Sequence, residues 1–408
     1  MFKLIRLAWR NIGRNPRRTF LTLLVIGMGT ASLMLVDAFI LGTEKNIIAM
    51  STEIFAGDAQ IHNPKFKELS EPEYTIPKKD AVIKTLQESP KIKSYTQRVQ
   101  IAGMLSSSRD AAGVQVIGVD FESELMVSRL RRSIQAGTYP EQNSQRPIMI
   151  GYKLAEQLQV SIGDKVVLTA SESGSNDLVQ EMFRVTALSN FHSRPMDRGM
   201  AFIPLSMAQS MLKIDQDIHQ IAVRFHDSSV AIDHSLPLWK KLDQLGVLAE
   251  GWDKIFPSVT AMIELNKTSV FIVAMILFAL VALSVLNTLF MAIYERMYEF
   301  GVLKAIGTKP RQLGIMILLE SLAMGFLGTI LGAVGGGALI FWLSHKGISY
   351  AEYEFNGMSM MEPIKTVIRF EQFTIMPVVV LLMTIVASIY PAYKASRITP
   401  SNAMRKTQ

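Results

Sequence analysis

The stretch VFIVAMILFALVALSVLNTLFMAI, residues 270–293, decides the fold because its 24 residues include no charged side chain. A helix needs about 20 mostly apolar residues to cross the hydrocarbon core of a bilayer. Three more stretches meet this requirement. The first of them is too long for the apolar core of a signal peptide and no Ala-x-Ala site follows it, so we expect it to be retained. We predict transmembrane helices over residues 19–42, 269–293, 313–343 and 374–393.

Basic residues set the expected orientation of these helices. Segments 1–18, 294–312 and 394–408 hold 14 of the 42 Lys and Arg residues, whereas residues 42–266 hold 24 basic and 27 acidic residues. Short loops rich in Lys and Arg stay in the cytoplasm. We therefore predict that both termini and loop 294–312 are cytoplasmic. The large block 43–268 and the loop 344–373 are then on the opposite side of the membrane.

The polar block between the first two spans has mixed secondary-structure signals. Short β-branched runs predict strands, and turn residues separate them from short amphipathic stretches. The expected fold is a membrane protein with four transmembrane helices and a large α+β periplasmic domain inserted between helices 1 and 2, with helical stalk ends. We expect strands at 115–119, 165–169 and 221–225, and helices at 80–87, 152–158 and 206–212.

The sequence contains few residues that would support an enzymatic function. The chain has no Cys, which excludes disulfides and thiolate metal sites, and its six His residues show no ligand spacing. We expect His219 and His226 at the surface. There is no G-x-S-x-G and no Gly-Lys dipeptide, so neither a serine hydrolase elbow nor a phosphate-binding loop is present. We predict no catalytic residue, no metal and no cofactor in this chain, and no nucleic-acid partner, because anionic lipid explains the basic segments better.

Three features near the membrane carry further expectations. Residues 1–18 place Phe2, Ile5, Trp9 and Ile12 on one stripe, which predicts an amphipathic helix in the cytoplasmic interface. Glu320 is expected near that interface, with no second buried acid or His beside it. Glycines spaced by four let helix backbones approach closely, either within the four spans or against a second copy of the chain. These glycines are Gly328, Gly332 and Gly336.

The segment Asn287–Pro310 resembles the signature of the FtsX-like permeases, the type VII (MacB/Lol) ABC transporter superfamily, in which a span is followed by E-R-x-x-E-[FIL]-G-x-[LM]-[KR]-A-[IL]-G. Three other segments, 8–19, 147–166 and 391–405, resemble the entry, the periplasmic domain and the ending of that family, so the resemblance covers nearly the whole chain. It implies that a cytoplasmic coupling helix within 294–312 contacts an ABC ATPase. The residues implied are Glu295, Arg296, Glu299, Gly301, Lys304, Ala305, Gly307 and Pro310, with the two glycines allowing sharp turns.

The resemblance also implies a bacterial inner membrane, with block 43–268 and loop 344–373 in the periplasm, together with partners and a mechanism. A separate ATPase dimer would hold ATP and Mg²⁺ and move the coupling helix, two permease chains would form a homodimer or heterodimer, and the periplasmic domain would follow. The chain is thus expected to be a non-enzymatic transporter subunit.

Lipoprotein release from the inner membrane is the function that the resemblance favours, because those permeases have four spans and no fused ATPase. An apolar cavity for acyl chains is expected at Phe39, Ile40, Val270 and Phe271. Segment 171–181 takes the place of the hook-like loop that recruits a periplasmic carrier in that branch, but is short and polar without an apolar tip. The alternatives are tripartite export of peptides, toxins or drugs through an adaptor, and regulation of murein hydrolases. A membrane-anchored receptor would leave the coupling motif unexplained.

Overall fold

The structure is a computed structural model that describes residues 16–141, 145–174, 177–349, 354–355, 358–359 and 363–399. The expected interfacial stripe at Phe2–Ile12 and the tail beyond residue 399 lie outside these residues. The chain forms two compact units. One contains residues up to 45, 263–349 and the segment from 363 onward, and the other contains residues 46–262 with 350–362.

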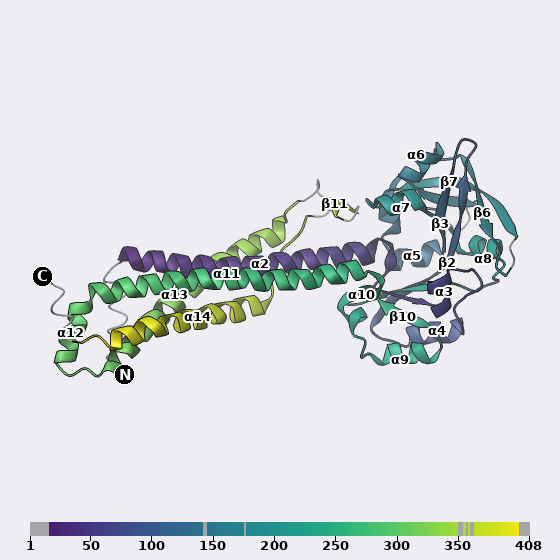
Figure 1. Cartoon of the computed structure of the whole chain (residues 1–408). Coiled ribbons are helices and arrows are strands. Elements are labelled where there is room, and N and C mark those ends of the chain that lie inside the picture. The colour runs from purple at the N-terminus through teal and green to yellow at the C-terminus, as the bar shows by residue number, and fades with distance from the viewer. Residues whose placement is uncertain are drawn as a thin grey trace. The chain divides into compact units, whose positions relative to one another are not determined.

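The first unit is built from long apolar helices, shown side by side in Figure 1. The described residues include four helices that are long and apolar enough to cross a membrane. A short fifth helix, α12, lies between the second and third of them. The bounds are α2 Pro16–Ser51, α11 Pro257–Glu295, α12 Met297–Ala305, α13 Pro310–Lys346 and α14 Phe370–Ser396.

Glycines set the contact between α2 and α13. A Cβ built at Gly332 would lie 2.4 Å from the carbonyl oxygen of Gly27 and 2.6 Å from the Cβ of Thr30. Cβ atoms at Gly328 and Gly336 would lie 2.8 Å from Ile26 and 2.9 Å from Ala31. The glycine strip therefore lies against α2 of the same chain, with the two backbones nearly in contact.

Hydroxyl and amide groups in this bundle find partners on other helices. Thr22 donates to Thr288 at 3.0 Å, which links α2 to α11, and Ser321 donates to Ser388 at 2.8 Å, which links α13 to α14. Asp37, the charged residue near the end of the first span, accepts from the amide of Gln372 at 2.8 Å. Such pairs offset the high cost of a polar group in an apolar environment.

The second unit is a mixed sheet of ten described strands in the order β10-β1-β9-β2-β3-β8-β5-β7-β4, with β6 paired to β2 and β7. The pairs β3–β8 and β5–β7 are parallel and the others antiparallel. The strands are β1 Ala59–His62, β2 Ile92–Ser106, β3 Ala111–Val119, β4 Ile134–Gly137, β5 Pro147–Gly151, β6 Lys165–Ser171, β7 Leu178–Ser189, β8 Met200–Pro204, β9 Gln220–Phe225 and β10 Leu248–Gly251.

Short helices cover the sheet, with α4, α9 and α10 at the β10 end and α6 and α7 near β5 and β7 (Figure 1). The expected strands and helices of this block are confirmed, and the prediction for 152–158 matches α6 residue for residue. The helices are α3 Pro64–Leu69, α4 Lys79–Gln87, α5 Phe121–Val127, α6 Tyr152–Leu158, α7 Arg194–Gly199, α8 Leu205–Leu212, α9 Pro237–Gln244 and α10 Trp252–Ile255. Three single-turn elements are η1 Thr52–Ala56, η2 Leu130–Ser133 and η3 Ser228–Ile232, and a hairpin pairs β11 Glu354–Phe355 with β12 Met358–Ser359.

A fully buried ion pair lies where η1, β2 and α5 meet. Arg98 on β2 contacts Glu124 on α5 through Nη2 at 2.6 Å and Nε at 3.0 Å, and both side chains are 0% exposed. The same guanidinium donates to the carbonyl oxygen of Phe55 at 2.6 Å and lies 3.8 Å from the centre of its ring. Phe55 belongs to η1, which directly continues α2. The end of that long helix is therefore attached to the middle of the sheet.

The expectation that His219 lies at the surface is wrong, whereas His226 is exposed. The His219 ring is buried and stacks on Phe66 at 4.5 Å between ring centres. Nδ1 accepts from the Gln100 amide at 3.0 Å, and Nε2 donates to the Pro72 carbonyl at 2.9 Å. Burial lowers the pKa of His219 because the charged form would be desolvated. It is a neutral core residue whose two ring nitrogens are both satisfied.

The glycine contact gives a prediction with an internal control. Replacing Gly332 by Ala forces α2 and α13 apart and is expected to cost about 1–3 kcal/mol, as overpacking does in well-packed cores. Replacing Gly335 by Ala, where an added Cβ meets no atom within 4 Å, should leave stability within about 0.5 kcal/mol of wild type. Melting temperatures of the purified chains in one detergent provide the measurement. Equal melting temperatures for the two variants would contradict this account of the contact.

Candidate coupling site

The segment between α11 and α13 is a nine-residue helix with a defined stop. The Gly307 N–H donates to the Lys304 carbonyl at 3.0 Å and the Thr308 N–H to the Leu303 carbonyl at 3.0 Å, which closes the end of α12 in a Schellman motif. Gly307 has φ +101, a conformation that favours glycine, so the expected turn lies there. Gly301 is different: it is buried inside α12, so the expectation of a turn at this position is wrong.

Arg296 points into the bundle. Its Nη1 lies 3.1 Å from Oε2 of Glu320 on α13, and its Nε lies 3.4 Å from Oε2 of Glu299. The guanidinium also lies 5.1 Å from the centre of the Phe300 ring, and its side chain is only 13% exposed. Glu320 is buried as well, and its companion is this arginine. In the single chain Arg296 therefore has its contacts inside the bundle, and its expected contact with the ATPase stays a prediction.

Lys304 also makes its contacts within the chain. Its Nζ donates to the carbonyl oxygens of Ser396 and Ile398, both at 2.7 Å. Ser396 is the last residue of α14, where the last turn of a helix leaves acceptors without intrahelical partners and carries partial negative charge, and Ile398 lies two residues beyond it. The amine therefore ties α12 to α14, while the Arg296–Glu320 pair ties the residue before α12 to α13.

The free face of α12 is at its tip. Ala305, Ile306 and Gly307 are exposed, and Ile306 has 78% of its surface accessible. Pro310, at the start of α13, is exposed too. Ile306 was not among the residues selected from the sequence. The sequence gives little indication that Ile306 is exposed, because an apolar residue within an apolar motif is normally expected to be buried. Its exposure becomes evident only when the position of the helix end is known.

Tyr298 on α12 and Tyr294 at the end of α11 add exposed aromatic surface, at 53% and 52%. Exposed apolar and aromatic residues beside charged ones are typical of a protein-binding patch. Glu295 is exposed, and Glu299 is half-buried against Arg296. We call Tyr298, Ala305, Ile306 and Gly307 the coupling tip.

The residues expected to form an acyl-chain cavity lie on two helices, Phe39 and Ile40 on α2 and Val270 and Phe271 on α11. None of them is buried in the single chain, and Phe271 is 67% exposed. Segment 171–181 is the end of β6, a turn and the start of β7. Leu178, the first residue of β7, is 72% exposed, so the hairpin has an exposed apolar residue beside its turn.

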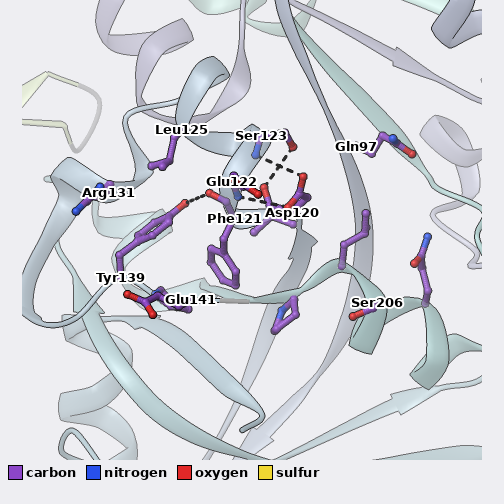
Figure 2. A pocket seen from close by; sticks show the side chains of 15 residues that line it. Gln97, Asp120, Phe121, Glu122, Ser123, Leu125, Arg131, Tyr139, Glu141 and Ser206 are labelled. Atoms are coloured by element: carbon purple, nitrogen blue, oxygen red, sulfur yellow. Dashed lines mark hydrogen bonds between the residues drawn. The ribbon is translucent and has the colours of Figure 1, made fainter. Parts of the chain in front are cut away.

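The second unit carries a pocket of about 560 Å³ beside α5 (Figure 2). Asp120 caps α5 by accepting from the amides of Glu122 and Ser123. The hydroxyl of Tyr139 donates to the Phe121 carbonyl at 3.1 Å. Burial and the nearby Glu124 carboxylate raise the pKa of Tyr139, so the phenol stays protonated and acts as a fixed hydrogen-bond donor. This arrangement fits a binding surface better than an acid–base site.

Two family models match the chain. The model for the MacB-like periplasmic core domain matches residues 19–232, and the model for the FtsX-like permease C-terminal region matches residues 271–400. Together they cover both units of the structure.

Curated relatives match across both units. The lipoprotein-releasing system transmembrane protein LolC of Xylella fastidiosa (strain Temecula1) is 22% identical over 330 residues, covering 78% of each chain. The corresponding protein LolE of Haemophilus influenzae is 22% identical over 336 residues, covering 79% of each chain. Among solved structures, the periplasmic region of MacB from Actinobacillus actinomycetemcomitans aligns with a TM-score of 0.35 and 15% identity, over 50% of this chain and 94% of that chain.

The Arg296–Glu320 pair can be tested with a double-mutant cycle. Replacing Arg296 by Met leaves a buried carboxylate without its partner, which is expected to cost about 3–5 kcal/mol. Replacing Glu320 by Met as well removes that charge and should recover more than half of the loss. Melting temperatures of the two single variants and the double variant, all in the same detergent, provide the comparison. Strictly additive losses would show that the two charges do not interact.

Proposed function

The chain belongs to the FtsX-like permeases with a MacB-like periplasmic core domain, and from that premise we propose that it couples ATP hydrolysis by a separate ATPase dimer to lipoprotein release from the inner membrane. As an ABC transporter permease it supplies the membrane subunit. ATP and Mg²⁺ bind to the partner, because this sequence has no Gly-Lys dipeptide and hence no phosphate-binding loop. Two permease chains, as a homodimer or a heterodimer, complete the complex.

The observation that carries the proposal is the way α12 is held. One face is tied to α13 through Arg296 and Glu320 and to α14 through Lys304, and the other end exposes Ile306. A short helix that docks by exposed apolar residues is a common mode of protein recognition. When an ATPase moves the coupling tip, the polar links pass the displacement to two membrane helices.

Orientation and substrate complete the proposal. The basic residues near α12 and at both ends of the chain favour a cytoplasmic coupling tip, so the second unit, inserted between helices 1 and 2, is periplasmic. The named relatives belong to lipoprotein-releasing systems, which supports a lipid-bearing protein as the cargo. The exposed Leu178 on the β6–β7 hairpin offers a contact for a periplasmic carrier. The same unit would contact an adaptor if the substrate were an exported peptide, toxin or drug, and a murein hydrolase if the chain regulated cell-wall cleavage.

Docking at the coupling tip is testable at Ile306. An Ile306→Asp substitution places a charge in the apolar contact, and we expect co-purification with the ATPase to fall by about tenfold or more. Ile306→Leu keeps the apolar surface and should co-purify as wild type does. Because Ile306 is 78% exposed, the melting temperature of the permease alone should not change in either variant. Normal ATPase recovery with Ile306→Asp would place the contact elsewhere.

The cargo is testable by photocrosslinking in whole cells. A photoreactive residue at Phe271, exposed on α11, should capture an acylated protein, and capture should depend on ATP hydrolysis by the partner. The same residue at Phe39, Ile40 or Val270 tests whether the two helices form one cavity. An ATPase variant that binds but does not hydrolyse ATP is the control. Capture of soluble peptides alone would favour the exporter, and capture of a murein hydrolase on the second unit alone would favour the regulator.

A further inference from the structure

A second pocket in the sheet unit, of about 520 Å³, is unusually basic. It lies between the end of α5, η2 and the end of β9, and Glu53 is its only acidic lining residue. We call it the cationic pocket. Its basic lining residues are Lys93, Arg129, Arg131, Arg132, Arg224 and His226.

Two of these cations have carboxylate partners. Arg129 forms an ion pair with Glu53. Arg224 lies 3.1 Å from the buried carboxylate of Asp58 and donates to the Val127 carbonyl at 2.9 Å. These contacts are structural, since they hold η1 and the end of α5 to the sheet. Glu53, the acidic residue that lines the pocket, is thereby already paired with Arg129.

The other three full charges are uncompensated. Lys93, Arg131 and Arg132 are exposed, and none has an ion-pair partner within the ranges that the structure describes. Figure 2 shows Arg131 at the edge of the neighbouring pocket, which Asp120, Glu122 and Glu141 also line. Like charges gathered around one hollow repel each other, so the fold gains nothing from this arrangement. Guanidinium groups match the geometry of phosphate oxygens, with two parallel hydrogen bonds available from each.

The hollow beside the cationic pocket has a different character. It has a volume of about 360 Å³ and shares Lys93 and Met126 with the cationic pocket. Four of its eight lining residues are apolar or aromatic, namely Leu86, Ile92, Tyr95 and Met126, and the other four are Gln87, Lys93, Ser94 and Ser123. Met126 stands between the two hollows with 70% of its surface exposed. A charged hollow adjoining a partly apolar one, with an exposed methionine between them, is complementary to an amphiphile with an anionic head and a hydrocarbon chain.

We propose that the cationic pocket binds the phosphate head group of an anionic glycerophospholipid, with the start of its acyl chain over Met126 in the adjoining apolar hollow. Lys93, Arg131 and Arg132 contact the phosphate. The apolar hollow favours a lipid over an acidic peptide, which would use the cations alone. This site is independent of the coupling tip and of the identity of the cargo, so its failure would leave the proposed transport function untouched.

The test uses the full chain in amphipol, without a bilayer, and a short-chain lipid below its micellar concentration. Dihexanoylphosphatidylglycerol should slow hydrogen exchange in peptides covering residues 86–95 and 121–132, with a measurable dissociation constant. Dihexanoylphosphatidylcholine, which has no net charge, should have a dissociation constant at least about tenfold higher than that of dihexanoylphosphatidylglycerol. Inorganic phosphate, which lacks the chain, should protect residues 128–132 weakly and leave 86–92 unchanged.

Paired variants separate the site from general electrostatics. Arg131→Gln with Arg132→Gln should weaken phosphatidylglycerol binding about tenfold or more. Lys240→Gln with Lys241→Gln removes the same charge from exposed positions on α9 that do not line the pocket, and should bind as wild type does. Met126→Ser should weaken the lipid but not phosphate. Equal binding of the two lipids, equal loss in both double variants, or protection by a hexaglutamate peptide alone would overturn the proposal.

Discussion

A polar group inside a bilayer is costly unless another part of the protein satisfies it, and this constraint organises the membrane helices. Glu320 is tolerated in α13 because Arg296 reaches it from the end of α11, and Asp37 is tolerated in α2 because Gln372 donates to it. Hydroxyl pairs such as Ser321 and Ser388 follow the same rule. The polar residues of the bundle therefore form contacts between helices, and they are too few to line a hydrophilic pore.

Close packing of the helices also stabilises the bundle, because the few polar contacts alone cannot hold the helices together. Neighbouring helices gain little from the hydrophobic effect when lipid surrounds them, so their association depends on van der Waals contact and a few hydrogen bonds. The approach of Gly332 to Gly27 allows α2 and α13 to make such contact over several turns. The strip thereby packs α13 against α2, the helix that continues into η1.

The sequence predicts local features well and pairings poorly. The four apolar helices, the six tested elements of the sheet unit and the turn at Gly307 could all be foreseen, because period, length and turn chemistry are local properties. The inward direction of Arg296, the partners of Lys304, the burial of His219 and the exposure of Ile306 could not. The first three depend on residues far away in the chain: Glu320 for Arg296, Ile398 for Lys304 and Phe66 for His219. The exposure of Ile306 depends on where α12 ends.

The attachment of η1 to the sheet fixes how the chain enters the second unit. The chain leaves the first unit within helices, since α2 continues to Ser51 and into η1 and α11 begins at Pro257. At the far end of α2, Phe55 is held by Arg98, whose carboxylate partner Glu124 is also fully buried. A buried pair is costly to break once its charges are desolvated, so this attachment should move as a rigid body with the sheet.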